Sequence, residues 1–451
     1  MKSWYIFTLF FLGSLSSVAY AAAPAGVDSA LESRFQLALQ DMVKKNSDDY
    51  YEVASLVLKA SGDMLSFQRM MQDQAAKENP AAQLWLARYL RMFVSTEPTV
   101  QKSVEELLRK AASRKYIPAM VEYAGVLYSA NSPEAGKKGL TMLMDACRQG
   151  DSKARALYLM VSGRMQSGGI TSPEVVSELK KNNYYLEEMI ASAQQEESSF
   201  IVWMEKAAEH GSAFASFALC EFVAPDAAEK YMQQAVNRHF PAALGHVGSD
   251  IVRREAAKME QFDAAKAAEG MHMLHLSAML CTPAAYGTLA SLYAEGYGKS
   301  IPRELIYELY RTAHRCGDPN GTAGLGYCMV LGVGCKQDPA AGIRLMESAR
   351  DKGAQWVNQA LASVYFNGDG VPANMNKAID ALMEDYVNGS RHAYALMAAI
   401  TAIGNASAAP DPRRARMYLD MAISNGDPQA GLYYDLFVKA GKWRFLEELV
   451  R

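Results

Sequence analysis

The sequence predicts an all-α fold, an α/α solenoid in which helical hairpins stack into a superhelix. One observation is a short loop with two glycines that returns every 36 residues, at Gly296 and Gly298, Gly332 and Gly334, and Gly368 and Gly370. Another is a capping side chain followed by proline where helices should begin, at Asn79-Pro80, Ser132-Pro133, Asp318-Pro319, Asp338-Pro339, Asp411-Pro412 and Asp427-Pro428. A period of this length indicates a repeat array rather than independent domains.

Composition and charge fit a packed chain and exclude several classes. Of the 451 residues, 50% are hydrophobic and 21% are charged, which is too apolar for a disordered protein. The 46 basic and 49 acidic residues give a formal net charge of −3. Because there is no basic excess, we expect no nucleic-acid partner.

Residues 1–21 are predicted to be a signal peptide. Lys2 precedes the apolar run 6–18, and the small residues Ala19 and Ala21 follow at the positions that a signal peptidase reads. The run is shorter than the ~20 residues needed to span a bilayer, and no later stretch reaches that length without charges. We therefore expect an exported protein, periplasmic or secreted, with no membrane insertion after the signal peptide is cleaved.

The stretch 22–77 is predicted to be an N-terminal helical cap. Its Leu31, Phe35 and Leu39 lie four residues apart and so fall on one face of a helix. The ends of a repeat array need such a cap, because a terminal unit has no neighbour to cover it.

The units are counted from the residue that opens each one. These opening residues are Glu78, Lys115, Gly150, Gly211, His239, Cys281, Gly317, Gly353, Gly389 and Gly426. The units over 78–168 are degenerate. The main array is predicted over 203–451 and is clearest over 281–404.

Two places depart from the regular spacing. The step from Gly150 to Gly211 is 61 residues, so 169–202 is predicted to be an inserted helical segment, either an added helix or a hinge. The steps on either side of His239 are uneven. They predict a kink of the stack near 200–260.

Each unit is predicted to be a helical hairpin. In the unit opened at Gly353, Val357 and Leu361 lie on one stripe of the first helix, and the second helix carries a similar stripe. Neither helix can bury its stripe alone, so neighbouring hairpins must provide the core. Small residues such as Gly326 should let the helices approach closely, and the loop glycines are expected to adopt positive φ.

One unit carries a family resemblance. Its landmarks are Gly317, the pair Leu325-Gly326, Met329, the loop Gly332-Val-Gly334 and the acidic cap Asp338. This pattern resembles the Sel-1-like repeat, most strongly over 281–404 and more weakly over 78–168, 203–280 and 405–451. The tetratricopeptide repeat is the near rival, but its usual period is about 34 residues.

The resemblance implies a function in binding rather than catalysis. Exported bacterial members of the family bind other proteins, so we expect a non-enzymatic scaffold that binds a protein or peptide in the bacterial envelope or outside the cell, through its concave face. The alternative is an enzyme that binds or hydrolyses cell-wall peptides or β-lactams, like the cysteine-rich branch of the family. That branch places its cysteines about eight residues apart, a spacing that this sequence lacks. Glycan binding and a purely structural role stay open.

A search for reactive motifs gives only isolated matches. Ser177 and Lys180 fit the Ser-x-x-Lys pattern of penicillin-recognising enzymes, without the companion motifs. Glu269, His272 and His275 could share a helix face and hold a metal, but a catalytic zinc site needs a placed third ligand and a second shell. We therefore interpret the pattern as two histidines on a partly exposed helix. We predict no catalytic residue, metal or cofactor.

Six cysteines are present, and Cys328 and Cys335 are the one pair that we consider for a disulfide. Cys281 and Cys316 lie about one unit apart, where stacked backbones are too far from each other for a disulfide, and Cys220 takes a small-residue position of the repeat. Buried thiols are therefore expected.

The partner-binding residues are predicted by resemblance to tetratricopeptide geometry, at three, six, seven, ten and thirteen residues after an opening residue. They are Trp85, Arg88, Arg91, His246, Ser249, Thr288, Ser291, Asn320, Tyr327, Trp356, Gln359, Ser363, Phe366 and His392. Aromatic and arginine side chains are typical of binding hot spots. Trp356 and Phe366 are the expected anchors, unless both fill gaps in the core.

Overall fold

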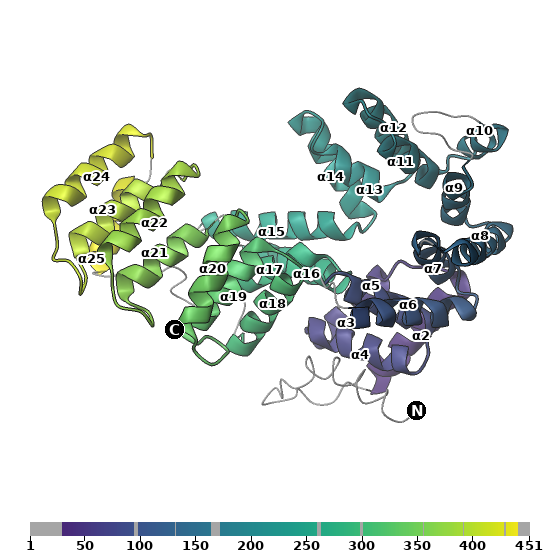
Figure 1. The fold of residues 1–451 in the computed structure, drawn as a ribbon, viewed down its shortest axis with the longest axis horizontal. Coiled ribbons are helices and arrows are strands. Elements are labelled where there is room, and N and C mark those ends of the chain that lie inside the picture. The colour runs from purple at the N-terminus through teal and green to yellow at the C-terminus, as the bar shows by residue number, and fades with distance from the viewer. Residues whose placement is uncertain are drawn as a thin grey trace.

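A computed structural model describes residues 29–93, 98–130, 132–163, 172–258, 263–297, 301–354, 356–390, 392–427 and 430–440, and Figure 1 shows their arrangement. These residues form an α/α solenoid of helices α2 to α25. Apart from an isolated bridge between Asn405 and Ala408, the described part of the chain has no strand pairing. The predicted signal peptide, residues 1–21, lies outside the described residues.

The N-terminal helices precede the first complete repeat. They are α2 (Ser29–Lys45), α3 (Tyr51–Ser61) and α4 (Met64–Ala76). Phe35 and Leu39 are fully buried, as the spacing on one helical face predicted.

The chain then runs outward through five hairpins. Their helices are α5 (Pro80–Arg91), α6 (Pro98–Ser113), α7 (Ile117–Ser129), α8 (Pro133–Arg148), α9 (Ser152–Val161), α10 (Pro173–Leu179), α11 (Tyr184–Ser192), α12 (Glu197–Glu209), α13 (Ala213–Leu219) and α14 (Pro225–Asn237). Figure 1 shows the chain turning back between α14 and α15, within the range where the uneven steps predicted a kink.

The returning part of the chain forms the rest of the stack. Its helices are α15 (Pro241–Ala257), α16 (Ala264–Met279), α17 (Pro283–Ala294), α18 (Arg303–Arg315), α19 (Pro319–Leu331), α20 (Pro339–Asp351), α21 (Val357–Asn367), α22 (Met375–Val387), α23 (Ala393–Ile403), α24 (Pro412–Ser424) and α25 (Ala430–Ala440). Leu325 and Leu361 are buried in this part, as predicted.

Every opening residue has the left-handed backbone that ends one helix before the next begins. Their φ angles run from 56° at His239 to 107° at Gly211. Asn46 and Asn182 share this conformation, with φ of 51° and 56°. Asn182 therefore opens a further unit inside the stretch expected to be an inserted segment. Asparagine marks a unit here because it tolerates positive φ better than most residues with a Cβ.

The glycine loops have the predicted conformation. Gly332, Gly334, Gly368 and Gly370 all have positive φ, between 66° and 76°. Gly332 and Gly368 cap the ends of α19 and α21, each donating its N–H to a carbonyl of the preceding turn. Gly298 lies outside the described residues.

The N-terminal helices and the returning helices pack against each other across a long distance in sequence. α16 contacts α3 and α4. Trp85 Nε1 on α5 donates to the Met279 carbonyl at 2.9 Å, and Gln68 Nε2 on α4 donates to Tyr286 Oη at 3.1 Å. The solenoid is thus closed on itself, and α5 to α15 form an arc between the two ends of the closure, hereafter the arc.

The apolar core follows the closure. One continuous cluster joins buried residues of α2–α7 to buried residues of α15–α25. Among the described residues, the middle of the arc holds three small separate clusters, over α7–α9, α9–α11 and α11–α13. The two ends of the arc are therefore fixed in a common core, while its middle is less extensively packed.

Candidate partner-binding surface

The predicted partner-binding residues divide by burial. Buried are Trp85, Tyr327, Ser363 and Phe366; partly buried are Arg88, Ser249, Thr288, Ser291, Asn320, Trp356, Gln359 and His392; exposed are Arg91 and His246. The structure thus corrects the prediction for the four buried residues.

Two features of the fold bury these four. The closure covers Trp85, which is 1% exposed and stacks on Tyr89 with ring centroids 5.2 Å apart. In the returning part, the first helices are enclosed by their neighbours. The buried residues of α19 run from Gly321 to Cys328 without a break, so Tyr327 has no open side. Phe366, 4% exposed near the end of α21, belongs to the core and cannot anchor a partner.

Most of the partly buried residues in the returning part make contacts within the stack. Gln359 Nε2 donates to Asp385 Oδ2 at 3.0 Å, and Ser291 Oγ lies 3.2 Å from Tyr310 Oη. His392 Nδ1 lies 3.0 Å from Asp427 Oδ2 of the next unit. These side chains connect helices to one another, and Trp356 precedes α21 as its N-terminal cap residue. In this half of the molecule, most of the predicted residues are therefore engaged in contacts within the stack and are poorly placed to bind a partner.

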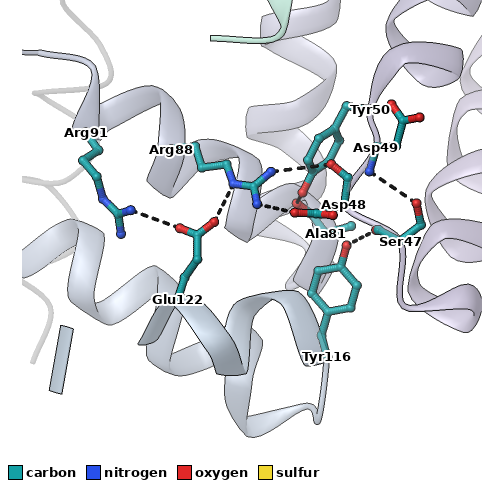
Figure 2. Close-up of polar contacts among 9 residues, drawn as sticks. All are labelled: Ser47, Asp48, Asp49, Tyr50, Ala81, Arg88, Arg91, Tyr116 and Glu122. Carbon is teal, nitrogen blue, oxygen red and sulfur yellow. Dashed lines mark hydrogen bonds and ion pairs between the residues drawn. The ribbon is translucent and has the colours of Figure 1, made fainter. Parts of the chain in front are cut away.

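The arc brings predicted residues together with others. Arg88 on α5 binds two carboxylates: its Nη2 lies 2.5 Å from Asp48 Oδ2, and its Nε lies 2.7 Å from Glu122 Oε1 on α7. Arg91 Nη1 lies 3.1 Å from the other oxygen of Glu122. Figure 2 shows the four side chains in one row, with Arg88 between the carboxylates.

The row of charges is partly shielded from water. Burial alone would raise the pKa of Asp48, but Arg88 and Lys153 outweigh this effect and lower it. Burial would likewise lower the pKa of Arg88, but Glu122 and Asp48 raise it. Asp48 and Arg88 are therefore both charged at neutral pH.

Asp48 lies in the connection 46–50 between α2 and α3, which we call, together with Tyr51 at the start of α3, the bridging segment. The Tyr116 hydroxyl donates to the Ser47 carbonyl, and the Ile117 N–H donates to Asn46 Oδ1 at 3.1 Å. At the other end, Tyr51 stacks on His239 with ring centroids 3.5 Å apart and planes 3° apart. The segment therefore bridges the start of α7 and the residue that opens the hairpin of α15.

These contacts lie on the inner side of the arc. Neighbouring first helices pack on one another, α5 with α7, α7 with α9 and α9 with α11, as expected where the curve is tightest. First helices of the arc also carry exposed apolar side chains, Met160 on α9 at 41% and Phe214 on α13 at 45%.

Sequence reasoning missed part of this surface. Glu122 stands seven residues after Lys115, a position that the chosen rule includes, so the rule itself could have found it. Asp48 and Tyr51 could not be found in that way because they precede the first recognised unit. The residue that marks their position is Asn46, which has positive φ like the opening glycines. An asparagine does not match the glycine pattern by which most units were recognised.

The isolated matches to reactive motifs gain no support. Among the described residues no group of three or more His, Cys, Asp or Glu could hold a metal ion. His275 instead lies 2.7 Å from the Met271 carbonyl and 2.5 Å from Tyr293 Oη. Ser177 and Lys180 are exposed on or beside the short helix α10. Cys328 and Cys335 are both free thiols.

In the part of the chain that the structure covers, no helix combines the length and the apolar character needed to cross a membrane.

Comparisons with known proteins agree with the repeat pattern. The family model of the Sel1 repeat matches residues 201–212, 319–353, 359–380 and 392–427. The chain therefore contains Sel1 repeats, as the unit opened at Gly317 predicted, rather than the rival tetratricopeptide type. No curated protein matches the chain.

Solved structures of low sequence identity resemble the chain. A protective antigen of uropathogenic Escherichia coli, which displays an SLR fold, is 13% identical with a TM-score of 0.39, covering 92% of this chain and 96% of that one. A Sel1 repeat protein from Oxalobacter formigenes is 18% identical with a TM-score of 0.37, covering 55% and 96%. A Sel1 repeat protein from Klebsiella pneumoniae is 15% identical with a TM-score of 0.31, covering 52% and 98%.

Proposed function

We propose that this Sel1-repeat protein is an exported, non-enzymatic scaffold that binds another protein through the inner face of its arc. The inner face is the surface formed by the first helices α5, α7, α9, α11, α13 and α15. The observation that carries the proposal is the row of Arg88, Arg91 and Glu122, in which two predicted residues meet a charged partner on the next hairpin. Solenoids present such extended concave surfaces to their partners.

The composition of this face supports a protein partner. Met160, Phe214 and Arg91 are all exposed on it. Aromatic residues, methionine and arginine are the side chains enriched at protein–protein interfaces. Exposed His246 on α15 extends the same face toward the other end of the arc.

Export to the bacterial periplasm or the outside of the cell is proposed from the sequence of residues 1–21. The charged start, apolar run and small residues at Ala19 and Ala21 are those of a cleaved signal. Cell fractionation combined with the mass of the purified protein tests this part. An N-terminus at Ala22 in an exported fraction supports it, and an intact N-terminus in the cytoplasmic fraction contradicts it.

Site-specific photo-crosslinking in living cells tests the binding face. A photoreactive phenylalanine analogue replaces His246 on the inner face in one variant. In the matched control it replaces Lys137, which is exposed on α8, a second helix of the arc. We expect a discrete protein adduct from position 246 and none from position 137. Equal adducts from both positions, or none from position 246 or from Arg91 replaced in the same way, would refute the assignment of the face.

A fluorescent penicillin tests the enzymatic alternative. Covalent labelling of the wild type that is lost in Ser177→Ala would show that the protein recognises penicillin, and it would contradict the scaffold function. We expect no label.

A further inference from the structure

Three phenylalanine side chains, hereafter the phenylalanine patch, pack on one another outside the apolar core. Phe240 directly precedes α15, and its ring pairs with two rings of α13: that of Phe214, with centroids 6.2 Å apart, and that of Phe217, with centroids 5.2 Å apart. None of the three belongs to the four apolar clusters formed by the described residues. Packing of the core therefore does not explain why three large aromatic residues meet here.

The patch lies on the unpacked side of α13. This helix packs against α12 and α14, and Ala215 and Leu219 are among its buried residues. Because a helix has 3.6 residues per turn, Phe214 and Phe217 lie on the opposite side. Phe214 is 45% exposed, and Phe217 and Phe240 are partly buried. Contiguous aromatic surface left open in this way is typical of a site for another protein.

The patch belongs to the inner face as defined above. Both α13 and α15 are first helices, and Figure 1 shows the chain turning back between them. Phe214 and Phe217 stand three and six residues after Gly211, positions that the rule for partner-binding residues includes. Exposed His246 follows Phe240 by six residues on α15. The patch therefore lies beside a residue that was already predicted to bind the partner.

Two exposed carboxylates lie close to the patch. Glu221 follows Phe217 by four residues, about one helical turn, and is exposed. Asp49 Oδ2 lies 4.0 Å from Nδ1 of His239, the residue before Phe240, and 63% of the Asp49 side chain is exposed. A carboxylate is thus placed near each end of the patch, on α13 and on the join before α15.

The cations of this region are turned toward other groups. Arg238 donates to the carbonyls of Ala208 and Ser212, so its guanidinium lies at the packed end of α12 and not on the patch. Burial raises the pKa of Glu188 on α11, and Lys153 on α9 partly opposes this rise. Lys153 is therefore placed beside another carboxylate. The surroundings of the patch favour positive charge on whatever binds there.

We propose that the phenylalanine patch binds a large apolar side chain of a protein partner whose neighbouring residues are lysine or arginine, and that Glu221 and Asp49 pair with these basic residues. The inference rests on the proposed function, since it names the chemistry of the partner for the same inner face. The rings supply apolar contact area, and the carboxylates favour a basic segment over an acidic one.

Peptide binding to the full-length protein, followed by fluorescence anisotropy, tests the inference. The probe is a fluorescein-labelled synthetic peptide with two leucines between two lysines, flanked by glycines. One control peptide has glutamates in place of the lysines, and another has serines in place of the leucines. The protein variants are Phe214→Ala, Phe217→Ala and Glu221→Lys. Phe222→Ala is the matched control, because Phe222 is 40% exposed but its ring pairs with Phe200 outside the patch.

We expect the wild type to bind the lysine–leucine peptide at least about tenfold more tightly than either control peptide. Phe214→Ala and Phe217→Ala should each weaken this binding by about tenfold, and Phe222→Ala should leave it unchanged. Glu221→Lys should reduce the preference for the lysine peptide over the glutamate peptide. If circular dichroism shows that Phe217→Ala has lost helix, the more exposed Phe214 decides.

Three results would overturn the proposal. They are an absence of binding to the lysine–leucine peptide, equal binding of the glutamate peptide, and binding that survives Phe214→Ala. Sedimentation of the unlabelled protein adds a fourth, since a wild-type dimer that becomes a monomer in Phe214→Ala would assign the patch to a second copy of this chain.

The outcome separates this inference from the proposed function. Failure of the peptide together with a specific adduct at position 246 would leave the inner face as the binding surface and remove only the phenylalanine patch. Failure of both would remove the surface itself.

Discussion

Left-handed residues at the unit joins are the feature that most of the chain shares. A residue in this conformation turns the chain sharply, so that two helices are joined by three to five residues and lie side by side. Glycine adopts it without a penalty, whereas residues with a Cβ pay about 1–2 kcal/mol. Four opening residues adopt this conformation despite its cost: Glu78, Lys115, His239 and Cys281. The glycine pattern alone therefore identified only part of the array.

Gly334 is expected to be the least replaceable of the loop glycines. Its φ is +66°, and an added Cβ would lie 2.2 Å from the Arg303 carbonyl oxygen, which is backbone and cannot move aside. Gly334→Ala should therefore lower the free energy of unfolding by about 3 kcal/mol or more. Gly353 is the matched control, since its φ is +84° but nothing lies within 4 Å of its Cβ position.

Urea denaturation of the two variants checks this prediction. Gly353→Ala should cost only about 1 kcal/mol, the penalty of the backbone conformation alone. Equal losses in the two variants would show that steric contact with Arg303 plays no part.

His275 should make stability depend on pH. Nδ1 faces the Met271 carbonyl, which can only accept, so Nδ1 carries the proton and Nε2 accepts from the Tyr293 hydroxyl. Burial lowers the pKa of His275 from 6.5 to about 4. The unfolded chain therefore takes up a proton near pH 6.5 that the folded chain takes up only near pH 4. The free energy of unfolding is therefore highest above pH 6.5 and decreases as the pH falls toward 4.

The predicted size of the effect is about 3 kcal/mol between these limits. Because carboxyl groups such as Glu295, whose pKa burial raises, act in the opposite sense, the test is a comparison. Unfolding of the wild type and of His275→Gln is measured from pH 4 to pH 7. The stability of the wild type relative to the variant should fall as the pH decreases, and parallel curves would contradict the assigned protonation state.

At the scale of the helices, the hairpins close where small residues meet. An added Cβ on Gly326 of α19 would lie 2.6 Å from the Gly342 carbonyl oxygen of α20, and the reverse distance is 2.5 Å. Gly248 of α15 and Gly270 of α16 stand in the same relation, at 2.5 and 2.7 Å. The glycines let the helix axes approach so that the flanking apolar residues interlock.

Gly342→Ala is therefore predicted to destabilise the protein by about 2–3 kcal/mol, through overpacking against α19. Gly136 on α8 is the matched control, because it is helical and nothing lies within 4 Å of its Cβ position. Gly136→Ala should instead stabilise the helix by about 0.5–1 kcal/mol. If the melting temperature shifts in the same direction in both variants, the close crossing of α19 and α20 is contradicted.

The sequence predicts these elements well because they depend on local patterns. The period placed the hairpins, and the small residue at Gly326 marked a crossing, since both follow from spacing along one helix. The inner face was predicted less well. Position rules taken from an open solenoid placed Trp85 and Tyr327 on a groove, but other parts of this chain cover them. Spacing within a unit carries no information about which distant unit will return to it.

At the scale of the whole molecule, the closure changes how stability is distributed. In an open stack each unit contacts only its neighbours, so damage spreads outward from one place. Here one core joins α2–α7 to α15–α25, and the middle of the arc depends on small clusters of its own. A compliant arc with fixed ends is well suited to adapting its inner face to a partner.

The closure depends on Trp85 more than on any other single contact described above. Its indole N–H satisfies the Met279 carbonyl, and its ring packs edge-on against Phe67 with centroids 5.4 Å apart. Trp85→Phe keeps an aromatic ring but removes the donor and part of the volume, which should cost about 1–3 kcal/mol. Leu159→Ala is the control, because Leu159 is buried in a small cluster of the arc.

Hydrogen exchange measured by mass spectrometry on these two variants tests the closed solenoid most directly. We predict that Trp85→Phe speeds exchange in α4 and α5 and also in α16 and α17, which lie about 190 residues further along the chain. Leu159→Ala should speed exchange only in α8 to α11. If Trp85→Phe leaves α16 and α17 as protected as in the wild type, the stack is open, and the closed solenoid is contradicted.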